Sequence, residues 1–372
     1  MSADFNDKQY LLQCFALAEL GRHTCSPNPV VGCVIVRDGQ TVGEGWHQVT
    51  GQAHAEVIAL KQAGELAFGA TAYVSLEPCA HHGRTSPCTS ALISSGISRV
   101  VYAMEDPNPL VAGKGAAQLH ASGVQVVGPL LQHQAEILNQ GFLKRMREGL
   151  PFVRVKLAMS LDGRTAMANG ESQWITGSDA RADVQQWRAR SDAVLTGIGT
   201  ILKDDASLNV RLADYAGTQP VRVIIDSNGR MPADAGTLGL SGNVLVAIAN
   251  ECGWSAPQNS KSTVTVKAFP GNNGKVDLKR VLQYLAGDLL VNEVLVEAGA
   301  TLSGALLQAG LVDELLVYVA PRLLGHAAMP LLQLTGLDKL SDSIALEFVD
   351  VTILGDDCRF RLAPRTDRVS EG

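Results

Sequence analysis

Several features that would each point to a particular class of protein are missing from this sequence. No apolar run approaches the roughly 18 residues that cross a bilayer, and the opening segment MSADFNDKQY lacks the basic and apolar regions of a signal peptide. Aromatic residues are scarce at 5%, and 31 Lys and Arg against 37 Asp and Glu give a net charge of -6. A broadly basic surface that binds nucleic acid is therefore not expected. No Gly-x-Gly-x-x-Gly follows a strand pattern, so nothing indicates a Rossmann dinucleotide fold.

The length and the cysteines suggest two domains and a metal or redox site. The chain has 372 residues and a mass of 39.3 kDa, about twice the size of a typical domain. Hydrophobic residues make up 46% and charged residues 18%, which excludes a disordered chain. In a reducing compartment, clustered cysteines favour a metal or redox site over disulfides. Five of the seven lie in the first quarter of the chain, namely Cys14, Cys25, Cys33, Cys79 and Cys88.

The first half alternates strand and helix patterns. Residues 30–46 predict a hairpin that turns at Asp38-Gly39. The elements expected after it are a helix, a strand, a second helix and a second strand, at residues 55–63, 72–76, 89–95 and 99–104, with Gly64 and Gly96 ending the helices. Strands separated by helices imply parallel pairing with helices on both faces of the sheet. This half is therefore predicted to be α/β.

A long helical pattern from Leu131 to Gly149 closes this half, and Pro151 forbids its smooth continuation. We therefore predict a first domain of residues 1–147 and a second domain of residues 148–372. Strand and helix patterns restart beyond Pro151. Residues 229–274 are rich in Gly, Asn, Ser and Pro, which favours irregular loops around two strands.

The strongest chemical pattern is His54-Ala55-Glu56, followed after a predicted strand by Pro78-Cys79 and then by Cys88. One His and two Cys thiolates leave the fourth tetrahedral position of zinc open for a water, whose pKa zinc lowers to roughly 7. If Glu56 opens the same helix as His54, its carboxylate can reach that water without being a ligand. It can then take the proton and deliver it to a ring nitrogen and the departing ammonia. The pattern predicts a zinc-dependent deaminase.

Plainer interpretations stay open at this point. Cys79 and Cys88 can be ordinary buried thiols and His54 a core histidine, although the order of the residues and the presence of Glu56 favour zinc. Two further histidines between the cysteines, His81 and His82, can compete as ligands, but we expect them near the substrate mouth.

The pattern resembles that of the cytidine-deaminase superfamily, H-x-E followed by P-C-x-x-C, except that eight residues, AHHGRTSP, separate the cysteines here. The chain more closely resembles the bacterial bifunctional riboflavin-biosynthesis enzymes, which deaminate a diaminopyrimidine ribosyl phosphate and then reduce its ribose. This resemblance extends over nearly the whole chain. The segments that carry it include PNPVVGCVIV, GEGWHQ, HAEV, EPCAHHGRTSPC, DPNP, GFLKRMREG, KLAMSLDGRTA, ESQWIT, DAVLTG and TLSGALLQAGLVDEL.

The resemblance implies a cytidine-deaminase-like three-layer α/β domain followed by a dihydrofolate-reductase-like α/β domain. It implies that zinc is held by His54, Cys79 and Cys88, and that Glu56 moves protons. The positions implied to contact the base or the sugar phosphate are Asn28, His47, Arg84, Asp106 and Asn108. The family loop often has Lys where Arg84 stands, but either cation can meet a phosphate. The two asparagines lie beside prolines, so turn chemistry explains them equally well.

For the second domain the resemblance implies reduction with NADPH. A strand that ends at Glu297, a small-residue turn at Gly299 and a following helix N-terminus can offer free amides to a phosphate, although a tight strand-to-helix connection explains the same pattern. The positions implied for the cofactor are Ala158, Trp174, Thr200, Asp204, Ser227, Gly299, Ala300, Thr301, Leu302, Ser303, Gly304 and Ala305. Those implied for the substrate are Ser172, Arg188, Leu208, Arg211 and Glu297.

Opening of the ribose ring demands a proton donor or acceptor beside the sugar. Asp204 is the first candidate and Lys156 the second, and both can also be solvated or paired charges. Arg188 and Arg211 are natural phosphate ligands, but Arg188 can equally lie on a solvated helix face. No residue can be named that contacts the 2′-phosphate, so the preference for NADPH over NADH follows from the resemblance alone.

We therefore predict a cytoplasmic, bifunctional riboflavin-pathway enzyme that acts on a phosphorylated pyrimidine, with no membrane or nucleic-acid partner, and that forms a homo-oligomer, a dimer or a tetramer. One alternative is a nucleic-acid-editing deaminase with a binding C-terminal half, against which the acidic charge balance argues. Another is a deaminase whose second half only binds a ligand or mediates assembly.

Overall fold

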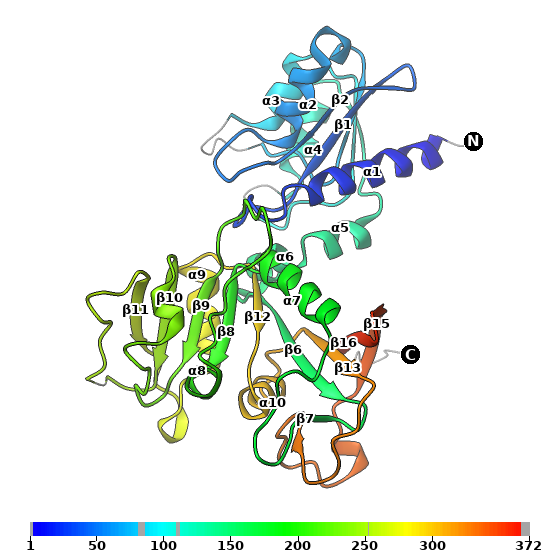
Figure 1. The fold of residues 1–372 in the computed structure, drawn as a ribbon. Helices are drawn as coiled ribbons and strands as arrows, with labels where there is room; N and C mark the ends of the chain where they lie inside the picture. The colour runs from blue at the N-terminus through cyan, green and yellow to red at the C-terminus, as the bar shows by residue number, and fades with distance from the viewer. Residues whose placement is uncertain (1–2, 81–85, 109–111, 252, 366–372) are drawn as a thin grey trace. The chain divides into compact units, whose positions relative to one another are not determined.

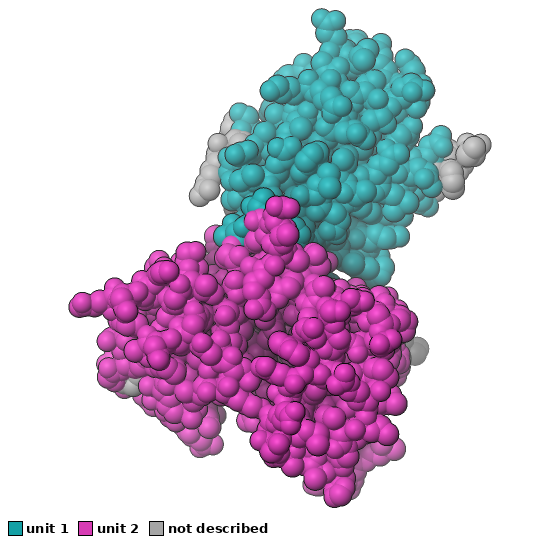
Figure 2. All heavy atoms as spheres, viewed as in Figure 1, with its two compact units in different colours: residues 1–149, 216–218 teal, residues 150–215, 219–372 magenta. Residues whose placement is uncertain are grey.

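The computed structural model describes residues 3–80, 86–108, 112–251 and 253–365 (Figure 1). The chain divides into two compact units (Figure 2). Unit 1 comprises residues 1–149 with 216–218, and unit 2 comprises residues 150–215 with 219–372. In the described part of the chain, no helix is both long and apolar enough to cross a membrane.

Unit 1 contains a five-stranded sheet in the order β2-β1-β3-β4-β5. β1 pairs antiparallel with β2 and with β3, while β3, β4 and β5 run parallel. The strands are β1 Gly32–Arg37, β2 Gln40–Trp46, β3 Thr71–Val74, β4 Arg99–Tyr102 and β5 Gln125–Val127. The helices are α1 Ala3–Glu19, α2 Ala55–Ala63, α3 Cys88–Ser94, α4 Lys114–Ala121, α5 Gln132–Leu138 and α6 Gln140–Glu148.

Apolar side chains on both faces of this sheet produce three layers. Successive residues of a strand point to opposite faces, so Ile35 and Val34 enter different cores. Ile35 packs with residues of α2, α3 and α4, whereas Val34 packs with residues of α1, α5 and α6. The predicted three-layer α/β architecture of the first half is therefore confirmed.

Local turn residues place the early elements as predicted. Asp38 and Gly39 both have positive φ, 50° and 76°, and connect β1 to β2 as a two-residue hairpin turn. Gly64 follows α2 with φ 55°, a conformation that glycine adopts without steric cost.

The prediction of one long helix over residues 131–149 is wrong. Two helices, α5 and α6, occupy this stretch and are separated at Asn139, whose φ of -117° is not helical. The Asn139 side chain is buried and makes two hydrogen bonds to the backbone of Val30, accepting from its N–H (2.9 Å) and donating to its C=O (3.0 Å). This distant partner, which no local pattern reveals, explains the break.

Unit 2 contains a nine-stranded sheet in the order β11-β10-β9-β8-β12-β6-β13-β16-β15. Neighbouring strands from β11 through β13 run parallel, and β16 pairs antiparallel with β13 and with β15. The strands are β6 Phe152–Ser160, β8 Ala193–Gly197, β9 Val221–Ile225, β10 Asn243–Ile248, β11 Thr263–Ala268, β12 Glu293–Val296, β13 Glu314–Ala320, β15 Leu346–Leu354 and β16 Asp357–Pro364. A separate small ribbon pairs β7 Arg164–Ala166 with β14 Met329–Pro330.

Helices cover both faces of the larger sheet. Residues of α7 and α8 enter the core on one face, and residues of α9 and α10 enter the core on the other. These helices are α7 Ser178–Arg190, α8 Ile198–Asp204, α9 Leu278–Gly287 and α10 Ala300–Gln308. The strands predicted between residues 229 and 274 are present as β10 and β11, whereas the C-terminal hairpin β15–β16 was not predicted.

Parallel pairing brings several strand ends to one edge of this sheet. In the register, Val155 of β6 lies opposite Val296 of β12, which lies opposite Leu195 of β8. Lys156 and Glu297, the next residues on β6 and after β12, therefore come to the same level of the sheet. The carboxyl edge of a parallel sheet is where α/β proteins bind their ligands.

Candidate active sites

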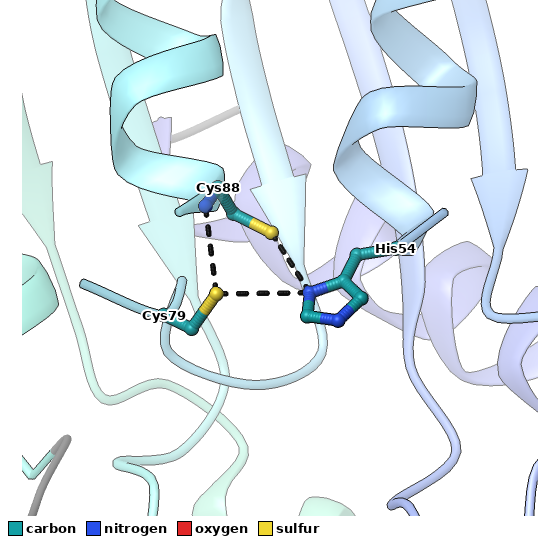
Figure 3. A group of neighbouring side chains, drawn as sticks. All are labelled: His54, Cys79 and Cys88. Carbon is teal, nitrogen blue, oxygen red and sulfur yellow. Dashed lines mark hydrogen bonds between the residues drawn. The ribbon is translucent and has the colours of Figure 1, made fainter. Parts of the chain in front are cut away.

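Three predicted metal ligands meet in unit 1. His54 immediately precedes α2, Cys79 follows β3, and Cys88 is the first residue of α3. The Nδ1 atom of His54 lies 3.1 Å from the Sγ atom of Cys88 and 3.6 Å from that of Cys79 (Figure 3). Within the described ranges, this is the one group of three or more His, Cys, Asp or Glu side chains close enough to hold a metal ion. One imidazole nitrogen and two sulfurs are a donor set that fits zinc with one position left open.

The contact between the two cysteines shifts their pKa values in opposite directions. The Cys88 thiol and backbone N–H both donate toward Cys79 Sγ, and together with His54 they lower the pKa of Cys79. The pKa of Cys88 is raised because it shares its proton with Cys79 and is buried. Metal binding requires deprotonated thiols, so zinc would displace this shared proton.

Glu56 lies in the first turn of α2, as predicted, and only 3% of its surface is exposed. Burial, followed by the negative charge of Cys79, raises the pKa of Glu56 above its ordinary value. A carboxyl group with a raised pKa is suited to carrying a proton between a water and a substrate. Glu56 therefore places a buried carboxyl group with a raised pKa beside the predicted metal ligands.

Asn28 and His47 form a second pair beside the metal ligands. The Asn28 side-chain N–H donates to His47 Nε2 over 3.1 Å, and His47 Nδ1 donates to the C=O of Ala53 over 3.3 Å. Burial lowers the pKa of His47, which keeps its ring neutral. The rings of His47 and His54 meet edge to face with centroids 5.5 Å apart. The backbone N–H of Asn28 also closes a turn onto the C=O of Cys25, so the turn interpretation holds for Asn28, while its contact with the base stays a prediction.

The other predicted base and phosphate contacts are only partly described. Asp106 and Asn108 follow β4, and Cys79 follows β3, so these residues leave two adjacent parallel strands at the same edge. The Asn108 N–H donates to Asp106 Oδ1 over 2.8 Å. Arg84, like His81 and His82, lies outside the described residues.

Three charged side chains converge in unit 2. Arg188 of α7 donates from Nε and Nη2 to the two carboxylate oxygens of Glu297 over 2.5 Å and 2.9 Å. Its third donor, Nη1, bonds the C=O of Asn209 over 2.9 Å, beside Leu208. Arg188 is buried, so the alternative of a solvated helix face is wrong. Because its partners, Glu297 after β12 and Asn209 after α8, are distant in sequence, helix periodicity alone gave no sign of the pair.

Lys156 is the third of these charges. Burial lowers the pKa of Lys156, while the charge of Glu297 opposes that shift. Burial alone would raise the pKa of Glu297, but Arg188, Lys156 and Arg211 hold it below its ordinary value. The ammonium also lies 6.0 Å from the centroid of the Tyr318 ring. A partly buried lysine with a lowered pKa is a candidate for proton exchange.

The remaining predicted reductase residues lie on several strands, helices and connecting segments of unit 2. Asp204 is the last residue of α8 and is exposed. Gly299 immediately precedes α10, where no side chain caps the helix. Arg181 lies 4.7 Å from the ring centroid of the exposed Trp174. The others lie as follows: Ala158 on β6, Ser172 between β7 and α7, Thr200 in α8, Leu208 and Arg211 after α8, Ser227 after β9, and Ala300, Thr301, Leu302, Ser303, Gly304 and Ala305 within α10.

Comparisons with known families match the two halves separately. Residues 5–104 match the cytidine and deoxycytidylate deaminase zinc-binding region, and residues 151–360 match the RibD C-terminal domain. The riboflavin biosynthesis protein RibD of Escherichia coli (strain K12) is 49% identical over 362 residues, which cover 94% of this chain and 97% of that protein. The RibD protein of Bacillus amyloliquefaciens is 42% identical and covers 96% of both chains.

Solved structures also match along nearly the whole chain, among them the following two. Acinetobacter baumannii RibD, form 1, has a TM-score of 0.89 and 46% identity, and covers 98% of this chain and 100% of its own. The second is a diaminohydroxyphosphoribosylaminopyrimidine deaminase/5-amino-6-(5-phosphoribosylamino)uracil reductase from Thermotoga maritima, with a TM-score of 0.85, 29% identity and the same coverage.

Fold, metal ligands and family matches together define a bifunctional enzyme, a zinc-dependent deaminase joined to a reductase. The chain belongs to the RibD family of riboflavin biosynthesis proteins. Its cofactors are Zn²⁺ and NADPH, and its substrate is a small molecule. The predicted family, fold class and cofactors are confirmed, and the alternative of a second half without enzymatic activity is wrong.

Proposed function

We propose that the enzyme hydrolyses the ring amine of a diaminohydroxyphosphoribosylaminopyrimidine and then reduces the ribosyl group of 5-amino-6-(5-phosphoribosylamino)uracil to ribityl. The names of both reactions are those of the Thermotoga maritima relative. The observation that carries the proposal is the convergence of His54, Cys79 and Cys88 beside the buried Glu56.

In the deamination, His54, Cys79 and Cys88 would hold zinc, and the chemistry that zinc would supply there is to lower the pKa of a water that attacks the ring carbon bearing the amine. Glu56 accepts one proton from this water and passes it to the ring nitrogen, and it then transfers the second proton of the former water to the amine, which leaves as ammonia. Asn28 and the neutral His47 border the base, and Asp106, Asn108 and Arg84 contact the base or the sugar phosphate.

In the reduction, the second unit would hold NADPH, which when bound would supply the hydride for the opened ribose. Asp204 or Lys156 exchanges the proton that ring opening requires. Glu297 and Arg188 hold each other in place beside Lys156, and with Ser172, Leu208 and Arg211 they contact the substrate. The N-terminus of α10 offers uncapped amides to a cofactor phosphate, with open space around Gly299. Ala158, Trp174, Thr200 and Ser227 complete the cofactor contacts.

We also propose a homo-oligomer that assembles in the cytoplasm. The edge strand β15 exposes apolar side chains, with Phe348 70% and Ile353 71% exposed, and a second copy of the chain would cover them. A reducing compartment keeps the zinc thiolates from oxidising. Native mass measurement on the purified enzyme tests the assembly, because a monomer at micromolar concentration would contradict it.

Glu56→Ala tests the deaminase proposal. The variant should retain about one zinc per chain and lose ammonia release by roughly 100-fold or more, because its proton carrier is gone. Zinc is measured by elemental analysis beside ammonia release, with Glu65→Ala, an exposed residue shortly after the same helix, as the matched control. Loss of zinc would make Glu56 a ligand, and unchanged turnover would remove it from the mechanism.

A further inference from the structure

Glu77 is a buried carboxylate to which the proposed chemistry gives no task. It lies between β3 and the metal ligand Cys79, and 2% of its surface is exposed. Its Oε2 accepts hydrogen bonds from the backbone N–H groups of Gly113 (2.9 Å) and Asp106 (3.3 Å), and its Oε1 accepts from that of Ala116 (3.0 Å). The Glu77 carboxylate therefore connects Asp106, in the loop after β4, to the start of α4.

The start of α4 depends on this carboxylate. The first N–H groups of a helix have no partner inside the helix, and no α4 side chain caps them. Glu77 supplies both the acceptor and the negative charge that a helix N-terminus favours. The contact is close, because a Cβ on Gly115 would lie 1.9 Å from the C=O of Pro78 and 3.2 Å from Glu77 Oε1. Only glycine permits this approach at position 115.

The same carboxylate fixes the residues proposed to contact the substrate. Glu77 holds the N–H of Asp106, and Asp106 Oδ1 in turn holds the N–H of Asn108. We infer that Glu77 is a positioning residue, which holds Asp106 and Asn108 where they bind the substrate of the deamination. This inference rests on the proposed function, in which those two residues contact the substrate.

A separate contact ties the body of α4 to the metal ligands. The Thr89 hydroxyl, next to Cys88, donates to the side chain of Gln118 in α4 over 2.9 Å. The Thr89 N–H also bonds the C=O of Cys79 over 3.3 Å. The Thr89–Gln118 contact does not involve Glu77. Loss of the Glu77 carboxylate should therefore release Asp106 and Asn108, while the body of α4 and the zinc ligands stay in place. The expected defect is in substrate binding and not in metal binding.

Glu77→Gln is the direct test, because glutamine keeps the shape but has a single acceptor oxygen and an NH₂ group that faces N–H donors. In the full-length holoenzyme, KM for the deamination should rise by about tenfold or more, with kcat within about threefold and zinc content unchanged. Hydrogen exchange of residues 105–108 and 112–116 should accelerate, while that of α2 should not. The matched control is Glu105→Gln, an exposed residue beside the same loop, which should leave KM and exchange unchanged.

Several results would overturn the positioning role of Glu77. An unchanged KM, or loss of zinc together with kcat, would overturn the inference. If Glu77→Gln does not fold, Glu77→Asp keeps the charge with a shorter reach and should raise KM in the same direction, and an unchanged KM would overturn the inference. If the parent enzyme releases no ammonia, the proposed function fails, and unaltered exchange in the variant would separately overturn the role of Glu77.

Discussion

The two active sites lie at the carboxyl ends of parallel strands but are assembled differently. In unit 1 the predicted metal ligands and the proposed proton carrier come from one short stretch of chain, from His54 to Cys88. In unit 2 the charged groups come from distant positions and are held by a buried ion pair between Arg188 and Glu297. The first site is built within one short stretch of chain, whereas the second depends on the register of a sheet. A disturbance of one should therefore leave the other working.

Of the changes that test this difference between the two sites, a substitution of Arg188 should have the largest effect. Arg188→Met leaves Glu297 without its bidentate partner in a buried position, so the free energy of unfolding of unit 2 should fall by about 3–5 kcal/mol. NADPH oxidation on the supplied aminouracil substrate should fall at least tenfold, while ammonia release stays within about threefold of the parent.

Urea unfolding and the two assays measure these effects, with the exposed Arg230→Met as the control. Parent-level NADPH oxidation would show that the buried pair is dispensable for reduction. A parallel loss of ammonia release in a zinc-replete protein would show that the two sites are not independent.

A shortened polypeptide of residues 1–147 tests whether the first site needs the second unit. The main division between the compact units follows Gly149, near the predicted boundary. We expect this polypeptide to fold with about one zinc and to deaminate within roughly tenfold of the full chain, because its core and its ligands lie within it. Zinc content and ammonia release are the measurements, and aggregation both with and without zinc would mean that the cores are shared.

The smallest effect should come from a substitution of Asp7, whose charge stabilises unit 1 outside the predicted metal site. Asp7 accepts hydrogen bonds from Arg99 over 2.9 Å and 2.6 Å and from the Tyr73 hydroxyl over 2.8 Å. The Arg99 contact lowers the pKa of Asp7. Asp7→Asn should therefore cost about 1–3 kcal/mol of stability at neutral pH.

This cost should depend on pH with a definite sign. The carboxylate stabilises the fold above its unfolded-state pKa of about 3.9, and the stabilisation is lost as the pH falls through its lower folded-state pKa. The difference between variant and parent should therefore narrow below about pH 4. Urea unfolding at pH 7 and at pH 3 measures it, with the exposed Asp38→Asn as the control. A difference that stays constant with pH would contradict the account.

Sequence patterns predicted those helix ends, turns and candidate metal ligands that depend on residues near one another in the sequence. The turn at Asp38-Gly39, the end of α2 at Gly64 and the zinc ligands depend on residue types at short spacing. The break between α5 and α6 was missed because the partner of Asn139 is the backbone of Val30, far away in sequence.

Partners that are distant in sequence also explain which parts of the two sites were not predicted. Glu77 stands inside the Glu-Pro-Cys segment that drew attention to Cys79, yet its three backbone partners follow the next strand. The burial of Arg188 depends on Glu297, which only the sheet register brings close. Charges that are paired through tertiary structure cannot be told from solvated ones by spacing alone.

The central claim is that the chain carries two separable reactions, and Asp204→Asn tests it most directly. The exchange nearly preserves size but removes a carboxylate that can exchange a proton. Supplied with the phosphorylated diaminopyrimidine and NADPH, the variant should release ammonia at the parent rate, stop oxidising NADPH and accumulate the deaminated, unreduced product, while NADPH still quenches its tryptophan fluorescence. NADPH oxidation at the parent rate would make Lys156 the leading proton carrier, and a joint fall of both reactions in a folded, zinc-replete protein would contradict two separate sites.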